Sequence, residues 1–112
     1  MKRFPYPRSN MNIVIYGKKK CYFCKAAKNL LDKVGLSYTY YDINDLVKKK
    51  ILKKPGDIID ILGNKTNNYK TVPMIFIYGD FLGGFTQLHE LINHMMHFKN
   101  VPTLNELSKN FN

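Results

Sequence analysis

The sequence predicts an α/β fold in which a four-stranded mixed sheet is flanked by helices. Two observations support this prediction. Residues 11–41 show a strand, a helix and a second strand, and such a βαβ unit holds its strands parallel with a right-handed crossover. Residues 71–82 show two short apolar runs around a Gly-Asp turn, which predicts a hairpin of antiparallel strands. The two kinds of pairing together make the sheet mixed.

The first strand and the first helix are predicted from the spacing of apolar residues, which changes from a continuous run to a helical repeat. Residues 11–16 (MNIVIY) are rich in β-branched and aromatic side chains, and Gly17 ends the run. Over residues 24–34, apolar side chains recur at three- and four-residue spacing, while lysines and Asp32 take the other face. We therefore predict an amphipathic helix there, which Gly35 ends.

The middle of the chain is predicted to hold a strand, an interrupted helix and a polar loop, over residues 37–41, 46–53 with 57–62, and 64–70. Asp42 ends the strand. Asn44 or Asp45 is the expected N-cap of the helix, and the Pro55-Gly56 pair divides it because proline interrupts helical hydrogen bonding.

The last part of the chain is predicted to hold the hairpin, a helix and a short final helix, over residues 71–82, from 86 onward, and 104–111. Gly83 and Gly84 join the hairpin to the first of these helices, and Thr103 is the expected cap of the second.

The two cysteines lie three residues apart, where the first strand gives way to the first helix. Cys21 falls at or just before the helix N-terminus, where free N–H groups and the macrodipole favour an anion. Lys18, Lys20 and Lys25 add positive charge, so we predict a pKa of the Cys21 thiol well below its ordinary value. Cys24 lies one turn deeper and is expected to stay a thiol. An exposed thiolate backed by a buried thiol predicts disulfide exchange.

Two other interpretations of the cysteine pair compete with the redox interpretation. A structural zinc site needs a second Cys or His pair at ligand spacing, and the candidates, His94 and His97, follow about seventy residues later within a predicted amphipathic helix. We therefore predict no metal. Two unreactive core cysteines are the other possibility. The position at a strand-to-helix junction among lysines favours the redox interpretation over it.

Length and composition indicate one domain. A chain of 112 residues buries enough surface to fold without staples, and two cysteines do not make a disulfide framework. We expect a basic N-terminal arm over residues 1–10 and one folded domain over residues 11–112. No apolar run approaches the length of a membrane span, so no membrane partner is expected. Free cysteines without an export signal predict a reducing, cytoplasmic location.

The strong positive charge of the chain indicates a negatively charged binding partner. The formal net charge is +10, and the densest cluster lies on a predicted helix between residues 48 and 54. Nucleic acid is not the expected partner, because no nucleic-acid motif surrounds the cluster and tryptophan is absent. We expect the positive electrostatic potential of the protein to attract anionic substrates and acidic protein tails instead.

The order of elements and three motifs together resemble a glutaredoxin of the dithiol type, in the thioredoxin superfamily. The resemblance covers residues 12–98, and its motifs are Lys18-x-x-Cys21-Tyr22-Phe23-Cys24, Thr71-Val72-Pro73 and Gly83-Gly84-Phe85-Thr86. It implies a thioredoxin-like fold with glutathione as co-substrate. Tyr22 stands where the family usually has proline, and residues 48–70 form a longer stretch than the family usually needs.

The resemblance implies a role for each matching residue. Cys21 is implied as the nucleophile and Cys24 as the resolving thiol. The implied glutathione contacts come from a charged side chain, a ring, backbone groups and the loop before the last helix: Lys18, Phe23, Val72, Pro73, Gly84, Phe85, Thr86 and Gln87. Pro73 is implied to follow a cis peptide bond. Gln87 takes a position that is often aspartate in the family.

We therefore expect a glutathione-dependent thiol-disulfide oxidoreductase, a monomer that takes part in electron transport by reducing protein disulfides or glutathione mixed disulfides. The partners are glutathione and disulfide-bearing proteins. The alternative is a carrier without significant reductase activity that binds an iron–sulfur cluster with glutathione in a dimer, because Tyr22 replaces the usual proline and the Cys21 thiolate can serve as a ligand.

Overall fold

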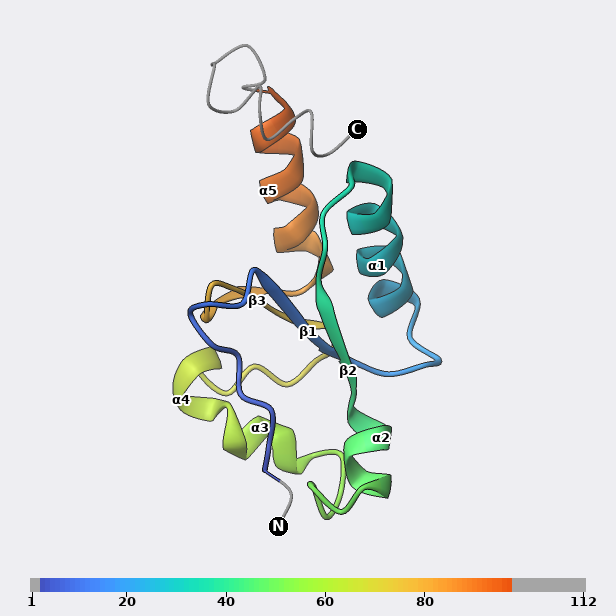
Figure 1. The fold of residues 1–112 in the computed structure, drawn as a ribbon, viewed down its shortest axis with the longest axis vertical. Helices are drawn as coiled ribbons and strands as arrows, with labels where there is room; N and C mark the ends of the chain where they lie inside the picture. The colour runs from blue at the N-terminus through green and yellow to red at the C-terminus, as the bar shows by residue number, and fades with distance from the viewer. Residues whose placement is uncertain (1–2, 98–112) are drawn as a thin grey trace.

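The computed structural model describes residues 3–97, which form a four-stranded sheet in the order β2-β1-β3-β4 (Figure 1). The strands are β1 (Ile13–Gly17), β2 (Thr39–Asp42), β3 (Met74–Ile77) and β4 (Asp80–Gly83). β1 pairs with β2 in parallel and with β3 antiparallel, and β3 pairs antiparallel with β4. The mixed sheet flanked by helices that the sequence predicts is therefore confirmed.

The helices cover the two faces of this sheet. They are α1 (Tyr22–Val34), α2 (Ile43–Lys48), α3 (Asp57–Ile61), α4 (Gly63–Thr66) and α5 (Phe85–His97). α1 and α5 pack side by side against one face, and α2, α3 and α4 cover the other (Figure 1).

The core consists of two clusters that share β1. Side chains alternate across a strand, so Ile13 and Ile15 face α1 and α5, while Val14 and Tyr16 face the helices on the other side. All four are buried, because a central strand covered on both faces has no solvent side. β1 therefore anchors the loop that carries the cysteines to both halves of the core.

The first helix ends as predicted and starts earlier than its apolar period suggests. Gly35 ends α1 in the left-handed conformation (φ 79°), and its N–H group donates to the carbonyls of Leu31 and Asp32. α1 begins at Tyr22, two residues before Cys24, because Cys21 acts as the N-cap. The prediction that Cys21 lies just before this helix is confirmed.

The expected N-cap of the next helix is wrong. Asp42 caps α2, and its Oδ1 accepts hydrogen bonds from the N–H groups of Asn44 (2.8 Å) and Asp45 (3.2 Å). The predicted strand over residues 37–41 is shifted for a related reason. β2 starts at Thr39 and runs through Asp42, so the strand passes directly into the capped helix.

Two further expectations in the middle of the chain are wrong. The lysine cluster does not share one helix, since α2 ends at Lys48 and Lys50 takes a positive φ of 61°, which brings Leu52 back into the core. The predicted loop over residues 64–70 begins as helix α4. Thr66 is buried there because its hydroxyl donates to the carbonyl of Leu62 at 3.1 Å, which satisfies the polar group.

The hairpin and its preceding cis peptide bond are present as expected. β3 and β4 are joined through Tyr78 and Gly79, and the Val72–Pro73 bond is cis. The final helix expected at residues 104–111 lies outside the described residues. Within residues 3–97, no helix has the length and apolar character needed to cross a membrane.

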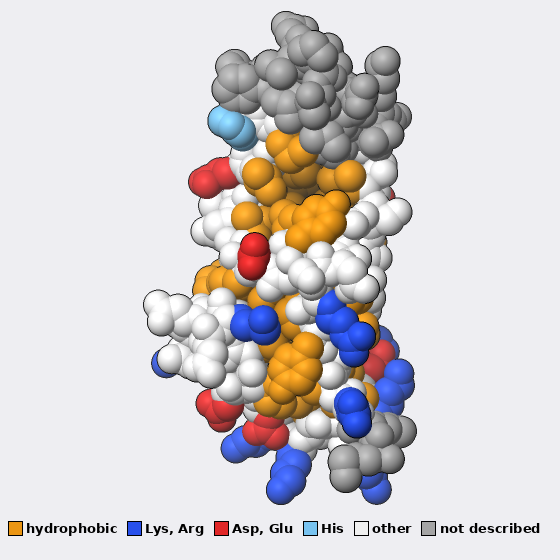
Figure 2. Space-filling model, turned by 60° about the vertical axis from the view of Figure 1, so that its left-hand side comes forward, with side chains coloured by type: hydrophobic (Ala, Val, Ile, Leu, Met, Phe, Trp, Pro, Cys, Tyr) orange, Lys and Arg blue, Asp and Glu red, His pale blue; other side chains and the backbone are white. Residues whose placement is uncertain are grey.

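The N-terminal arm lies on the same face as α2, α3 and α4. Residues 3–10 form no helix or strand, and the Phe4 ring stacks on Tyr16 at 5.6 Å between centroids. The Tyr16 hydroxyl donates to the carbonyl of Pro5. On the face in Figure 2, lysine and arginine side chains gather in the lower half of the molecule, where these elements lie.

Candidate active site

The two cysteines are joined by a disulfide at the start of α1. Their Cα atoms lie 5.2 Å apart, and the N–H group of Cys24 points to the Sγ of Cys21 at 3.2 Å. Cys24 is fully buried, whereas Cys21 is half-buried in the loop before the helix. Cys21 is therefore the more exposed of the two cysteines, and its role as the nucleophile stays a prediction.

The surroundings of Cys21 favour negative charge on its sulfur. As N-cap, the Cys21 sulfur faces the free N–H groups and positive dipole end of α1. α1 has no acidic residue in its first turn, and Lys20 and Lys25 are exposed nearby in the chain. After reduction of the disulfide, these groups stabilise a Cys21 thiolate relative to the thiol.

A cavity of about 260 Å³ lies beside the disulfide. Its lining comes from α1, the loop before β3 and the start of α5, and consists of Phe23, Tyr69, Thr71, Val72, Pro73, Gly84, Phe85 and Thr86. Cys21 Sγ lies 4.0 Å from the carbonyl oxygen of Val72, which puts the reactive sulfur next to this groove. The groove can hold a small peptide with its own sulfur near Cys21.

Six of the predicted ligand-binding residues line the groove together: Phe23, Val72, Pro73, Gly84, Phe85 and Thr86. Phe23 stacks on Phe85 at 5.8 Å between ring centroids, so α1 and α5 meet at one wall. Gln87 does not line the groove. Its Oε1 accepts a hydrogen bond from the Gly84 N–H at 2.9 Å, which holds the loop before α5.

The sequence interpretation missed Tyr69 and Thr71 as groove residues. Thr71 could have been found, because it directly precedes Val72-Pro73 in the second motif. Tyr69 lies in the segment predicted to be a polar loop, and its ring packs on the Phe81 ring at 5.1 Å between centroids. A Cβ on Gly84 would stand 2.6 Å from the Tyr69 hydroxyl, so glycine is needed for this close approach.

Lys18 lies beside the groove rather than in it. It lines a smaller adjoining cavity of about 70 Å³, together with Lys70 and Val72. The carbonyl of Lys18 accepts a hydrogen bond from Tyr40 Oη at 3.2 Å, which holds the loop before Cys21 in place. Lys70 was not predicted, although it directly precedes the second motif. Two ammonium groups are therefore available for carboxylates on this side of Val72.

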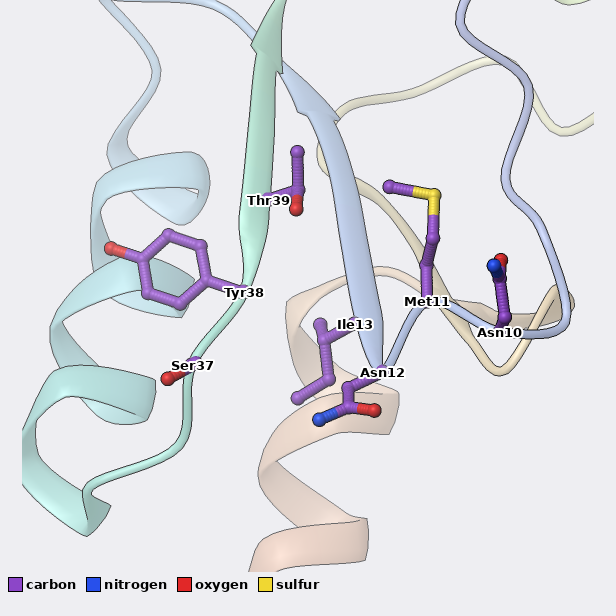
Figure 3. A pocket seen from close by; sticks show the side chains of 7 residues that line it. All are labelled: Asn10, Met11, Asn12, Ile13, Ser37, Tyr38 and Thr39. Atoms are coloured by element: carbon purple, nitrogen blue, oxygen red, sulfur yellow. The ribbon is translucent and has the colours of Figure 1, made fainter.

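Two further cavities among residues 3–97 have no cysteine and no charged residue in their linings. The cavity in Figure 3, of about 290 Å³, is lined by residues 10–13 and 37–39, at the end of β1 remote from the cysteines. Another, of about 240 Å³, is mainly apolar and follows α5, where Figure 2 shows hydrophobic side chains on the surface. Among the described residues, no group of three His, Cys, Asp or Glu side chains is placed to hold a metal ion.

Comparison with known proteins identifies the family. The Glutaredoxin family profile matches residues 13–82. Over 83 residues the chain is 36% identical to glutaredoxin-2 of Schizosaccharomyces pombe. This alignment covers 74% of this chain and 69% of the yeast protein. Over 100 residues the chain is 32% identical to bovine mitochondrial glutaredoxin-2. This alignment covers 82% of this chain and 59% of the longer bovine protein.

Solved structures agree with this match. The buckwheat glutaredoxin–glutathione complex superimposes with a TM-score of 0.62 at 28% identity, over 88% of this chain and 81% of that one. The holo form of glutaredoxin C1 from Populus tremula x tremuloides gives a TM-score of 0.61 at 25% identity, over 88% of both chains. With the paired cysteines at the start of α1, these matches show that the chain belongs to the glutaredoxin family of the thioredoxin superfamily.

Proposed function

We propose that the protein is a glutathione-dependent thiol-disulfide oxidoreductase that reduces glutathione mixed disulfides and protein disulfides. One observation carries the proposal: the disulfide joins a half-buried helix-capping Cys21 to a fully buried Cys24, beside a groove of peptide size. An accessible sulfur with a protected partner is the arrangement that thiol–disulfide exchange requires.

The reaction with a protein–glutathione mixed disulfide begins at Cys21. Its thiolate attacks the glutathionyl sulfur, so a Cys21–glutathione disulfide forms and the original S–S bond breaks. The protein thiolate leaves with the electron pair and takes a proton from water. A second glutathione, as its thiolate, then attacks the glutathionyl sulfur on Cys21. Glutathione disulfide forms, and Cys21 is released as a thiolate.

A protein disulfide requires both cysteines. Cys21 attacks one sulfur of the substrate and releases the other as a thiolate. Cys24, once deprotonated, attacks the Cys21 sulfur, which frees the substrate and forms the Cys21–Cys24 disulfide seen in the structure. Two glutathione molecules then reduce this bond and leave as glutathione disulfide. Since Cys24 is buried, its attack is confined to the Cys21 sulfur of the mixed disulfide.

The groove supplies contacts for glutathione. The backbone next to the cis Val72–Pro73 bond and the start of α5 at Phe85 and Thr86 line it on two sides. We assign the carboxylates of glutathione to Lys18 and Lys70, which share the adjoining cavity. The buckwheat protein, 28% identical to this chain, was solved as a glutathione complex, which supports glutathione as the ligand. Gln87 acts through its hydrogen bond to Gly84.

The cluster-carrier alternative is second because the chain offers few ligands. An iron–sulfur cluster takes four thiolates, and residues 3–97 contain two cysteines, of which Cys24 is fully buried. The alternative needs a second copy and two glutathione thiols. Iron and visible colour in protein purified without oxygen would support it. The cytoplasmic location and the monomeric state stay predictions, and the bovine relative is named as mitochondrial.

The test is glutathione-coupled reduction of the mixed disulfide between glutathione and 2-mercaptoethanol. We compare the native protein with Cys21→Ser and Cys24→Ser. Activity should disappear with Cys21→Ser, because the nucleophile is removed, and persist with Cys24→Ser, because a glutathione mixed disulfide needs one thiol. Absence of turnover by the native protein, with its fold confirmed by circular dichroism, would refute the proposal.

A second measurement checks the electrostatics of the nucleophile. In Cys24→Ser, thiolate absorbance at Cys21 should rise with a midpoint well below the ordinary pKa of a cysteine thiol. The cause is the helix N-terminus and the lysines around the loop. A midpoint at the ordinary value would show that the N-cap position does not activate the sulfur.

A further inference from the structure

Tyr22 is the most exposed large hydrophobic side chain among residues 3–97. It is 79% exposed, against 58% for Tyr78 and 53% for Phe23. The residue is the first of α1 and directly follows the N-cap Cys21 in the chain. It contributes nothing to either core cluster. With Phe23, which is also exposed, it forms an aromatic pair on the surface directly after the reactive cysteine in the chain.

The rings around Tyr22 extend the groove outward. Tyr22 meets Phe23 edge to face at 5.2 Å between centroids, and Phe23 stacks in turn on Phe85 at 5.8 Å. Phe23 and Phe85 line the glutathione-sized groove, whereas Tyr22 is outside its lining. A mixed disulfide has two halves. When one half fills the groove, the Tyr22 ring remains free for the other.

The charged residues closest to Tyr22 in the chain are all lysines. Lys20 precedes Cys21, Lys25 follows one turn along α1, and both are exposed. Within the described part of the chain, the ion pair nearest to the cysteines in sequence joins Lys19 to Asp45 at 3.8 Å, between largely exposed side chains. Such a pair is weak in water, so the surface beside Tyr22 keeps a positive potential.

We propose that Tyr22, Lys20 and Lys25 form a docking surface for the polypeptide half of the mixed disulfide. The surface selects cysteines whose neighbours are acidic and apolar. This inference rests on the proposed function and names its substrate class. Aromatic rings near the centre of a contact supply much of its affinity, and complementary charge raises the association rate and rejects basic partners.

The test uses two glutathionylated peptides of equal length that share a leucine beside the cysteine. One carries aspartates around it and the other carries lysines. The native protein should show a kcat/KM about tenfold higher for the acidic peptide at low salt, because steering by complementary charge has at least this size. The preference should shrink at high salt, which screens exposed charges. The double variant Lys20→Gln/Lys25→Gln should lower the acidic-to-basic ratio, and the ratio cancels any change in thiolate reactivity.

Tyr22→Ala tests the ring. It should raise KM about tenfold for both peptides, the size expected for an aromatic anchor. Turnover of the small glutathione–2-mercaptoethanol disulfide should stay unchanged. Tyr78→Ala removes a similarly exposed tyrosine from the hairpin turn and should leave every value unchanged.

Three results would overturn the inference: equal kcat/KM for the two peptides, an unaltered KM in Tyr22→Ala, or an equal loss in Tyr78→Ala. Absence of turnover with the small disulfide would be distinguishable from these, because it would refute the oxidoreductase function itself.

Discussion

Gly17 is the last residue of β1, and side-chain atoms of Tyr40 and Cys24 occupy the position that a Cβ on Gly17 would take. A Cβ at this position would stand 2.9 Å from Cys24 Sγ and would also collide with the hydroxyl of Tyr40. Gly17→Ala should therefore lower the free energy of unfolding by about 1–3 kcal/mol, as overpacking does. Urea denaturation measures this change.

Gly56→Ala is the matched control. No atom lies within 4 Å of the added Cβ, and the backbone (φ −65°) suits alanine. Its stability should change by less than about 0.5 kcal/mol. Equal urea midpoints for the Gly17→Ala variant and the native protein would contradict the contact of Gly17 with Tyr40 and Cys24.

Tyr40 makes stability depend on alkaline pH. Burial, and then the negative charge of Asp42 and the neighbouring Tyr38, raise the pKa of Tyr40 from 10.0 to about 12. The unfolded chain releases this proton first, so the stabilisation is complete below pH 10 and is lost as pH rises to about 12. The free energy of unfolding should fall over this window.

Tyr40→Phe should make that fall shallower. It will not abolish the fall, because burial also raises the pKa of Tyr16. Below pH 9 the same variant should lose about 1 kcal/mol through the missing hydrogen bond to the Lys18 carbonyl. Denaturant titrations from about pH 8 to 12 measure both effects, and parallel curves for the two proteins would exclude Tyr40 as their source.

At the scale of elements, the start of α2 depends on one carboxylate. Asp42→Ala removes the acceptor for the N–H groups of Asn44 and Asp45, and should destabilise the protein by about 1 kcal/mol. Asp42→Asn keeps an acceptor oxygen and should retain most of the stability. Thermal unfolding of the two variants compares them, and equal losses would show that the carboxylate charge matters rather than the cap.

Elements with strong local signals were predictable. Among the short helices, α3 matches the helix expected over residues 57–62, whereas the bounds of α2 and the existence of α4 were not predicted. α1 has a regular apolar period and a glycine stop, and the hairpin has its turn residues, so nearest neighbours in the sequence specify them. Between Lys49 and Thr66, the path of the chain is determined by which side chains become buried in the core. Leu52 and Thr66 reach the core through a positive φ at Lys50 and a hydroxyl bonded to Leu62, which neither polarity nor period reveals.

At the scale of the molecule, β1 contributes side chains to both cores, so we expect the two cores to unfold as one unit. Leu31 is buried in the cluster with α1 and α5, and Leu62 is buried in the cluster on the other face. Leu31→Ala and Leu62→Ala should each cost about 2–5 kcal/mol. Circular dichroism and tyrosine fluorescence should give one coincident transition for each variant. The exposed Asn29→Ala in α1 should be neutral, and separate transitions would mean that the two layers unfold independently.

Local patterns were enough to identify the order of the four strands and of the long helices α1 and α5, the family motifs, and Cys21 as the more exposed cysteine of the pair. Spacing and the helix N-terminus are properties of neighbouring residues. The groove required the folded chain. Val72 comes to 4.0 Å from Cys21 across a separation of 51 residues, and Tyr69 and Lys70 arrive with it. These contacts depend on β1 pairing with β3 and on α5 packing against α1, which are long-range events without a local signal.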